Sequence, residues 1–273
     1  MSQIDAMFER LRSQGRKALM PFLTAGHPSQ EWTSAALAEF QARGCAMAEI
    51  GFPYSDPIAD GPVIQDSYTK ALAKGIKNQA IFDIVARFKK AGASKSSESP
   101  MPVVGMVSYS IIYKMGLRSF VDIAQKHGFD GAIVPDLLVE EATELRAICN
   151  ERNFSLIHLT TPTTPRDRAI RIAESSTGFL YYVSVAGITG ERRALPEELA
   201  ANVAWLRQRT SLPICIGFGI STPEHVSALA PVADGLIIGS AIVRRMETLA
   251  NLPVAEGVKQ LGDFVASLVA ATN

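Results

Sequence analysis

Two acidic residues stand where their side chains could transfer protons. Glu49 interrupts the apolar run Ala46–Ile50, and Asp60 follows eleven residues later. In a strand, Glu49 would point to the same side as Met47. A carboxylate is costly to bury without a partner or a task, and burial raises its pKa toward the range that suits a general acid/base. The sequence therefore offers Glu49 as a catalytic acid/base, or else as a structural carboxylate paired with a donor on a neighbouring strand.

The segment that joins the two carboxylates is a stiff loop. Gly51–Pro62 contains three prolines and two glycines, and it carries Asp56 and Asp60. Each aspartate has an alternative role in a turn, because Asp before Pro or Gly commonly hydrogen-bonds its own backbone. The nearness of Asp60 to Glu49 favours a functional role for Asp60. We therefore take Glu49 and Asp60 as a candidate pair for acid/base chemistry.

Two glycine turns in the last quarter of the chain are typical of phosphate binding. Gly217-Phe218-Gly219 ends an apolar run, and Gly239-Ser240 ends the next one and opens a helix. Glycine lets backbone N–H groups approach an anion, and the N-terminus of a helix favours negative charge. Tight turns that bind nothing are the alternative interpretation. The two turns together predict a phosphate group on the substrate.

Residues for other chemistries are missing from the strand ends. A Schiff-base aldolase needs a lysine there, but no apolar run contains one and Lys114 lies beyond the third run. The four histidines are dispersed, and His158, inside an apolar run, suits a satisfied core imidazole better than a metal ligand. We therefore expect no metal site. What remains is cofactor-free acid/base chemistry on a phosphorylated substrate that carries its own electron sink.

Short apolar runs alternate with helical segments along the whole chain. Such runs suit strands that are buried on both faces of a parallel sheet. Trp32, Ala36 and Phe40 illustrate the helical spacing between them. The expected strands are Ala18–Leu23, Ala46–Ile50, Val103–Val107, Gly131–Val134, Ser155–Leu159, Phe179–Val183, Pro213–Ile216 and Gly235–Ile238.

Eight strands that are each followed by a helix predict an α/β fold, a (β/α)8 TIM barrel forming a single domain over residues 1–273. An open doubly wound sheet is the alternative, but its Gly-rich fingerprint is missing after the first strand. An extra N-terminal helix, apolar over Ile4–Leu11, is expected to plug the barrel floor, and another extra helix over Val254–Leu268 follows the eighth strand. The long connection Ser184–Pro196 follows the sixth strand, so we expect it to be a lid over the site.

Composition limits the classes of partner and compartment. Lys+Arg 27 balances Asp+Glu 27, so there is no basic surface for nucleic acid or for a membrane. No apolar run is long enough to span a membrane, and the charged start of the chain does not resemble a signal peptide. Cys45, Cys149 and Cys215 are odd in number and far apart. Because such cysteines are typical of reduced core thiols, we expect a cytoplasmic protein.

The loop motif identifies a family. The segment over residues 49–65, EIGFPYSDPIADGPVIQ, closely resembles the signature of tryptophan synthase alpha chains. The resemblance extends over nearly the whole chain and includes Pro135-Asp136-Leu137, Gly187–Gly190 and Gly217–Ile220. It implies a barrel that cleaves indole-3-glycerol phosphate to indole and glyceraldehyde 3-phosphate, with the indole ring as the internal electron sink.

The same resemblance implies roles for individual residues. Glu49 would be the general acid/base at C3 of the indole and at the glycerol hydroxyl, and Asp60 would accept a hydrogen bond from the indole N–H. Thr189 would lie in the lid and help to orient Asp60. The implied substrate-binding residues are Phe22, Val107, Tyr109, Ile133, Tyr181, Thr189, Gly190, Phe218, Gly219, Gly239 and Ser240.

The resemblance also implies a partner. Relatives dock the catalytic face onto a beta chain that holds pyridoxal phosphate, in an αββα tetramer, and pass indole to it. No cofactor is expected in this chain. Many relatives have an asparagine near Ser110 and Ile111, and a proline where Leu138 stands, so these three positions depart from the family at the expected interface.

Two other functions stay open at this point. Another phosphate-binding barrel, such as an indole-glycerol-phosphate synthase or a sugar-phosphate epimerase, would need a strand-end lysine or a set of metal ligands. A non-catalytic barrel that regulates a partner would have no need for Glu49 and Asp60, and both are present.

Overall fold

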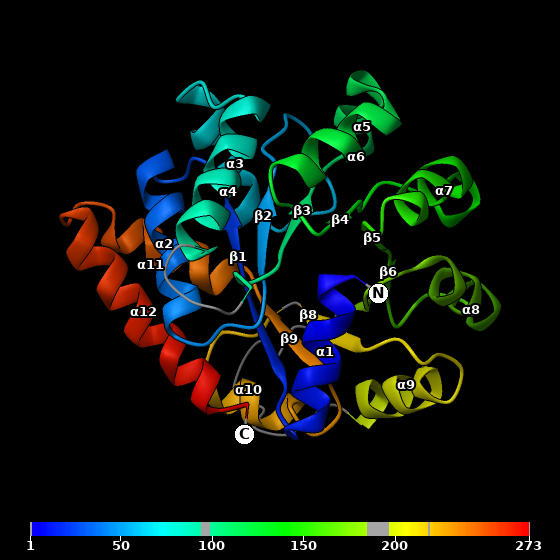
Figure 1. Cartoon of the computed structure of the whole chain (residues 1–273). Helices are drawn as coiled ribbons and strands as arrows, with labels where there is room; N and C mark the ends of the chain where they lie inside the picture. The colour runs from blue at the N-terminus through cyan, green and yellow to red at the C-terminus, as the bar shows by residue number, and fades with distance from the viewer. Residues whose placement is uncertain (1, 94–98, 185–196, 218, 273) are drawn as a thin grey trace.

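The computed structural model describes residues 2–93, 99–184, 197–217 and 219–272, and there a set of parallel strands is surrounded by helices (Figure 1). The strands are β1 (Ala18–Thr24), β2 (Ala48–Gly51), β3 (Val103–Met106), β4 (Gly131–Ile133), β5 (Ser155–Ile157), β6 (Leu159–Thr160), β7 (Leu180–Val183), β8 (Ile214–Gly217) and β9 (Gly235–Ile238). They pair in the order β5-β4-β3-β2-β1-β9-β8-β7-β6. This is the nearly closed parallel barrel that the eight apolar runs predict.

The fifth barrel strand differs from the expectation. Ser155–Leu159 was expected to be continuous, but β5 and β6 are separated by His158, so the nine described strands fill eight positions of the barrel. The reason is that two backbone N–H groups of this segment donate to side-chain hydroxyl groups. The backbone N–H of Leu156 donates to Thr177 Oγ1 at 2.8 Å, and that of His158 donates to Ser176 Oγ at 3.0 Å. Hydroxyl groups replace strand-to-strand hydrogen bonds here, and the ladder is interrupted.

Helices follow the strands on the outside of the barrel (Figure 1). They are α1 (Gln3–Ser13), α2 (Gln30–Ala42), α3 (Pro62–Ala73), α4 (Asn78–Ala93), α5 (Tyr109–Met115), α6 (Leu117–Lys126), η1 (Val139–Glu141), α7 (Thr143–Glu151), α8 (Arg166–Ser175), α9 (Glu197–Arg207), α10 (Pro223–Leu229), α11 (Ser240–Leu249) and α12 (Val254–Ala270). Both extra helices that the sequence predicts are present, as α1 and α12.

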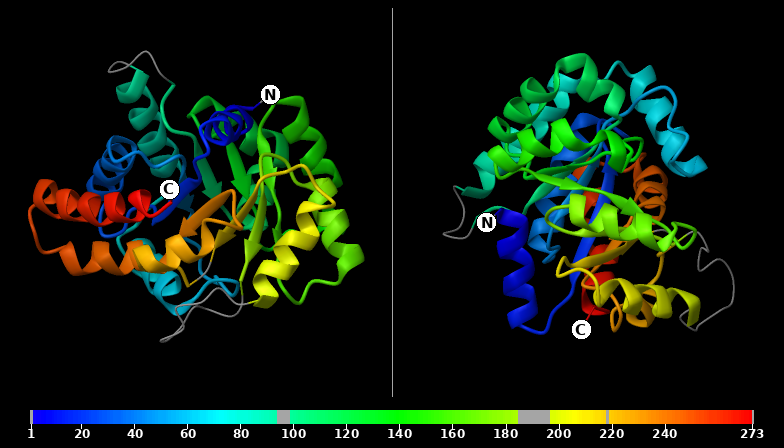
Figure 2. Two further views of the ribbon diagram at one scale, coloured as in Figure 1. Left: turned by 90° about the horizontal axis from the view of Figure 1, so that it is seen from below. Right: turned by 90° about the vertical axis from the view of Figure 1, so that its right-hand side faces the viewer.

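Helix α1 closes one end of the barrel. Figure 2 shows it lying across the end from which the strands start. Ser2 and Asp5 begin the helix with reciprocal side-chain caps. The apolar face of the helix packs in one cluster with inward residues of the strands, and the rings of Phe8 and Phe179 lie 6.0 Å apart. This packing confirms that α1 plugs the barrel floor.

Alternate residues of each strand serve two cores. Met47 and Val104 belong to the inner cluster, inside the barrel, whereas Ala48, Ile50 and Val103 belong to the outer cluster between strands and helices. The two-residue period of a strand causes this division. No helix among the described residues is both long and apolar enough to cross a membrane.

An aspartate ties together the strand starts near the floor. Asp130 Oδ2 accepts the Val103 N–H at the start of β3 and the Lys89 ammonium, each at 2.8 Å. The side chains of Lys89 and Asp130 are only 16% and 12% exposed, so neither is well solvated. The same carboxylate therefore accepts the N–H of a strand terminus and neutralises a partly buried cation.

We expect Asp130→Ala to lower the free energy of unfolding by about 2 kcal/mol, because the buried Val103 N–H loses its acceptor and the Lys89 ammonium keeps only the Met101 carbonyl, at 3.0 Å, in place of its counter-ion. Asp122→Ala is the matched control. It breaks an exposed pair with Arg152, which joins α6 to the end of α7, and should cost less than about 1 kcal/mol. Urea denaturation of the two variants measures both losses of stability, and equal losses would contradict the stabilising role of Asp130.

Candidate active site

Glu49 lies near the C-terminal end of β2 and points into the barrel. It is paired in register with Phe22 on β1 and with Val104 on β3, and its side chain shares the inward direction of Met47, as expected. The residue is 2% exposed, and among the described residues Oε1 has no hydrogen-bond partner. The structural alternative, in which a donor on a neighbouring strand pairs with Glu49, thus leaves this oxygen unexplained.

Asp60 is held in place by its own loop. Its N–H donates to the Pro57 carbonyl at 3.0 Å, and the Gln65 amide donates to the carbonyls of Pro57 and Asp60 at 3.1 and 2.8 Å. Gln65 lies in the first turns of α3, so the helix fixes the loop. Asp56 is exposed and accepts the Ile58 N–H through its backbone carbonyl. Its turn role, the alternative raised from the sequence, fits this position.

The surroundings give the two carboxyl groups different proton affinities. Burial, and to a lesser extent the charge of Asp60, raises the pKa of Glu49 to about 8. Burial raises the pKa of Asp60 to about 6. Near neutral pH, Glu49 therefore holds a proton that it can give away, while Asp60 is mostly ionised. Such a division into one acid and one anion is typical of acid/base sites.

Apolar side chains line the same end of the barrel. Phe22 packs in a small buried cluster with Ile64, Tyr68 and Val243, and Tyr54, Val63 and Met106 pack against it. We call this set the mouth cluster. Of its members, only Phe22 was expected from the sequence. The spacing of Ile64, Tyr68 and Ala71 along α3 is the helical signal that could have indicated Ile64 and Tyr68.

Two further expected residues lie inside the barrel. Ile133 on β4 and Tyr181 on β7 belong to the inner cluster. Burial raises the pKa of Tyr181 well above its usual value, and the charges of Glu49 and Asp60 add to the effect. Tyr181 therefore lies close enough to both carboxyl groups for their charges to raise its pKa.

Two expected residues are not brought to the mouth cluster. Val107 is fully buried in the outer cluster, and the preceding Met106 packs against the mouth cluster instead. Tyr109 begins α5, packs against the outer cluster, and contacts Tyr113 in a tilted arrangement with ring centroids 6.2 Å apart. The strand period explains the first case, because neighbouring residues face opposite sides.

The expected phosphate turns have open backbone. Gly239 caps α11, Ser240 is its exposed first residue, and a Cβ added at Gly239 would meet nothing within 4 Å. Gly219 follows β8 with a φ of 77°, a conformation that favours glycine. Thr189, Gly190 and Phe218 lie outside the described residues. The described part of the site thus offers the N-terminus of α11, which has no side-chain cap, beside the barrel mouth.

His158 and the three cysteines lie in the core. His158 is buried, its Nε2 lies 3.2 Å from Ser175 Oγ, and burial lowers its pKa to about 4, which confirms a satisfied core imidazole. Cys45, Cys149 and Cys215 are buried and free. Within the described ranges, no group of three His, Cys, Asp or Glu residues is placed to hold a metal ion.

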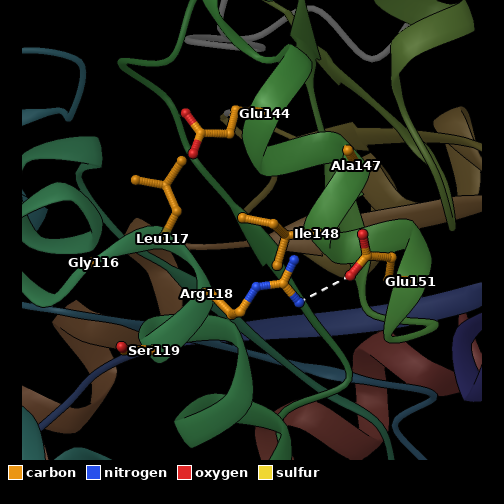
Figure 3. A pocket seen from close by; sticks show the side chains of 8 residues that line it. All are labelled: Gly116, Leu117, Arg118, Ser119, Glu144, Ala147, Ile148 and Glu151. Atoms are coloured by element: carbon orange, nitrogen blue, oxygen red, sulfur yellow. Dashed lines mark hydrogen bonds and ion pairs between the residues drawn. The ribbon is translucent and has the colours of Figure 1, made fainter.

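A cavity of about 440 Å³ opens elsewhere, between α6 and α7 (Figure 3). Its polar lining includes Glu144 and Arg118, and Arg118 pairs with Glu151 at 2.9 Å. None of the expected site residues lines it. The candidate active site is therefore the barrel mouth at Glu49 and Asp60 and not this outer groove.

Comparison with known proteins shows the family that this chain resembles. The model of the family described as tryptophan synthase alpha chain matches residues 8–271. A tryptophan synthase alpha chain from Rhodopirellula baltica is 55% identical, covering 98% of each chain, and one from a Geobacter species is 40% identical, covering 98% of this chain and 97% of that one. The crystal structure of tryptophan synthase subunit alpha from Legionella pneumophila superposes with a TM-score of 0.88 at 32% identity, covering 100% of this chain and 98% of that one. These relatives match the resemblance found in the motifs and not the alternative barrels.

The raised pKa of Glu49 predicts a pH-dependent effect of Glu49→Gln on stability. Because the folded-state pKa of about 8 lies above the ordinary value of 4.5, the folded protein holds this proton more tightly than the unfolded chain. Its contribution to stability is fully present below about pH 4.5 and is lost as the pH rises through about 8. Glutamine cannot ionise. As the pH rises between these two values, the free energy of unfolding of the variant should therefore increase relative to that of the unaltered protein, by on the order of a few kcal/mol in total. Denaturant titrations at several pH values measure the difference in free energy of unfolding between the two proteins. A difference that does not change with pH would contradict the raised pKa of Glu49.

Proposed function

Since this chain belongs to the tryptophan synthase alpha chain family and is a lyase of the alpha reaction in tryptophan synthesis, we propose that Glu49 and Asp60 carry out the chemistry of that reaction. The reaction cleaves indole-3-glycerol phosphate to indole and glyceraldehyde 3-phosphate. The observation that carries the proposal is the buried carboxyl group of Glu49, which has an unpartnered oxygen and a pKa raised to about 8 in the barrel mouth.

Glu49 can supply both proton transfers. In its protonated form it gives a proton to C3 of the indole ring, which makes an indoleninium ion. The resulting carboxylate then takes the proton of the substrate's glycerol hydroxyl, on the carbon next to the ring. The bond between C3 and that carbon breaks, its electron pair returns to the ring, and the aldehyde forms. One proton is given and one is recovered, so Glu49 ends the cycle as it began.

Asp60 would stabilise the charge that develops on the ring. When C3 is protonated, positive charge appears at the ring nitrogen, and an ionised carboxylate that accepts its N–H lowers the energy of this state. With a pKa of about 6, Asp60 is mostly ionised at neutral pH. The ring itself would lie against the mouth cluster, which offers Phe22 and Ile64 as apolar walls. Gly219, Gly239 and Ser240 would hold the phosphate at the start of α11.

We also propose that residues 1–273 act as one barrel domain in the cytoplasm and that the chain needs no cofactor of its own. The acid/base cycle above supports the last point, because the indole ring supplies the electron sink. Pyridoxal phosphate would belong to the beta chain.

Exposed apolar side chains support docking of a beta chain on the same face. Ile58, Tyr113 and Leu138 are 89%, 72% and 58% exposed. They follow β2, β3 and β4, which are neighbours in the barrel, so they gather along one sector of the rim. An αββα tetramer that covers this sector would bury them and keep the small apolar product indole away from water.

The three departures from the family pattern fall into two groups. Ser110 and Leu138 are exposed, whereas Ile111 packs against the outer cluster. Ser110 belongs to a small network in which the Asp136 carboxylate accepts the Ser108 hydroxyl at 2.7 Å and the Tyr109 N–H at 2.8 Å. Partner specificity should therefore depend on Ser110 and Leu138 more than on Ile111.

We expect Glu49→Gln to keep the fold and to lower indole release at least about 100-fold, because an amide of the same size cannot exchange the proton. Indole released from indole-3-glycerol phosphate is measured with and without a beta chain, and circular dichroism reports the fold. Near-normal turnover would remove Glu49 from this role. Loss of folding would instead support its structural alternative.

We expect the isolated chain to be a weak enzyme that its own beta chain activates. Ile58→Ser should raise the concentration of beta chain needed for half-maximal activation by about tenfold, because a central apolar contact is lost. Leu72→Ser is the matched control. Leu72 is also an exposed aliphatic side chain, but it lies on α3, away from the rim sector. Equal effects of the two substitutions would contradict docking on this sector, and a beta chain from a distant relative should activate less well.

A further inference from the structure

Tyr68 is a buried tyrosine whose hydroxyl has no partner among the described residues. It lies on α3, is 0% exposed, and belongs to the mouth cluster with Phe22. A buried phenol that makes no hydrogen bond is costly, so such groups are usually paired. Tyr68 and Glu49 thus place two unpartnered polar atoms at the same end of the barrel.

Gly51 brings the hydroxyl of Tyr68 close to the catalytic strand. A Cβ added at Gly51 would lie 2.5 Å from Tyr68 Oη, closer than a real Cβ atom comes to another residue. Gly51 is two residues after Glu49, and residues two apart in a strand face the same side. The phenol therefore occupies the space that a side chain at Gly51 would fill, on the same face of β2 as Glu49.

The helix that carries Tyr68 is firmly attached to the barrel. The neighbouring Ser67 hydroxyl lies 2.6 Å from Thr24 Oγ1 at the end of β1, and it also donates to the Ile64 carbonyl at 2.7 Å. Lys70, one turn further, forms an ion pair with Glu247 of α11. With these contacts on both sides, the ring of Tyr68 has a fixed position, as a group that orients another side chain requires.

Three titratable groups face this hydroxyl. The carboxyl groups of Asp60 and Glu49 and the phenol of Tyr54 all act on it, and with burial they raise the pKa of Tyr68 well above its usual value. The hydroxyl therefore keeps its proton and can only be a donor toward a carboxylate. Among the two carboxylates Asp60 has the larger effect. Gln65, one turn before Tyr68 on α3, already holds the Asp60 carbonyl, so Tyr68 lies on the side of the helix that faces the Asp60 loop.

We infer that Tyr68 is a positioning residue of the alpha reaction, whose hydroxyl donates a hydrogen bond to the Asp60 carboxylate when indole-3-glycerol phosphate fills the barrel mouth. The bond keeps Asp60 ionised and directed at the indole N–H. This inference rests on the proposed role of Asp60. It gives the unpartnered phenol a task that packing alone does not require, since phenylalanine would fill the same space.

The test is Tyr68→Phe, assayed by indole release with a beta chain present. The variant should lower kcat about tenfold and change KM less than about twofold, because the lost bond serves the transition state. A donor to a carboxylate favours its ionised form, so the acid limb of the pH profile of kcat should move up by about one pH unit. The free energy of unfolding should not fall, because an unpartnered buried hydroxyl is removed.

Tyr182→Phe is the matched control. It deletes the hydroxyl of a tyrosine that is 1% exposed but packs in the outer cluster, and it should leave kcat and the pH profile unchanged. In an Asp60→Asn background, Tyr68→Phe should not lower the residual rate further. An unchanged pH profile, or an effect on KM alone, in Tyr68→Phe would overturn the inference while the lyase assignment stands. Absence of indole release by the unaltered protein would instead overturn the proposed site chemistry.

Discussion

A carboxyl group held away from water, with one oxygen unpartnered among the described residues, is the constraint on which the site depends. Glu49 is 2% exposed, and burial raises its pKa to about 8. In water the same group would be ionised at neutral pH and could not give a proton to carbon. The barrel mouth therefore has to stay apolar around Glu49, and the stability that is lost there must be recovered in other parts of the fold.

The elements after β2 keep the mouth both apolar and ordered. The loop Phe52–Gly61 is stiff, α3 begins at Pro62, and Gln65 holds the carbonyls of Pro57 and Asp60. The next turn of the same helix adds Tyr68 to the apolar wall. One helix thus positions the loop, the second carboxylate and part of the pocket. A movement of α3 would change all three together, which is a physical reason for coupling between docking at the rim and catalysis.

Stability is concentrated at the opposite end and on the outside of the barrel. Helix α1 fills the floor with apolar side chains, and the outer cluster joins the strands to the surrounding helices. Asp130 accepts the N–H at the start of β3 and pairs with the partly buried Lys89. This separation follows from the parallel direction of the strands, because every strand starts at the floor and ends at the mouth. Residues at the two ends can therefore serve stability and chemistry independently.

The sequence by itself determined the barrel, the inward direction of Glu49 and the family. Runs of apolar residues and the two-residue period of a strand are local properties, and the motif over residues 49–65 is continuous in the chain. Only the tertiary structure decided that Met106 and not Val107 reaches the mouth cluster, that the fifth strand breaks at His158, and that Tyr68 enters the space left by Gly51. These three features depend on contacts between residues far apart in sequence, namely β3 with α3, β5 with the turn at Ser176 and Thr177, and α3 with β2. The strand period makes Met106 and Val107 face opposite sides, but no local period specifies which partner each residue meets. Those contacts are fixed only when the barrel brings the elements together.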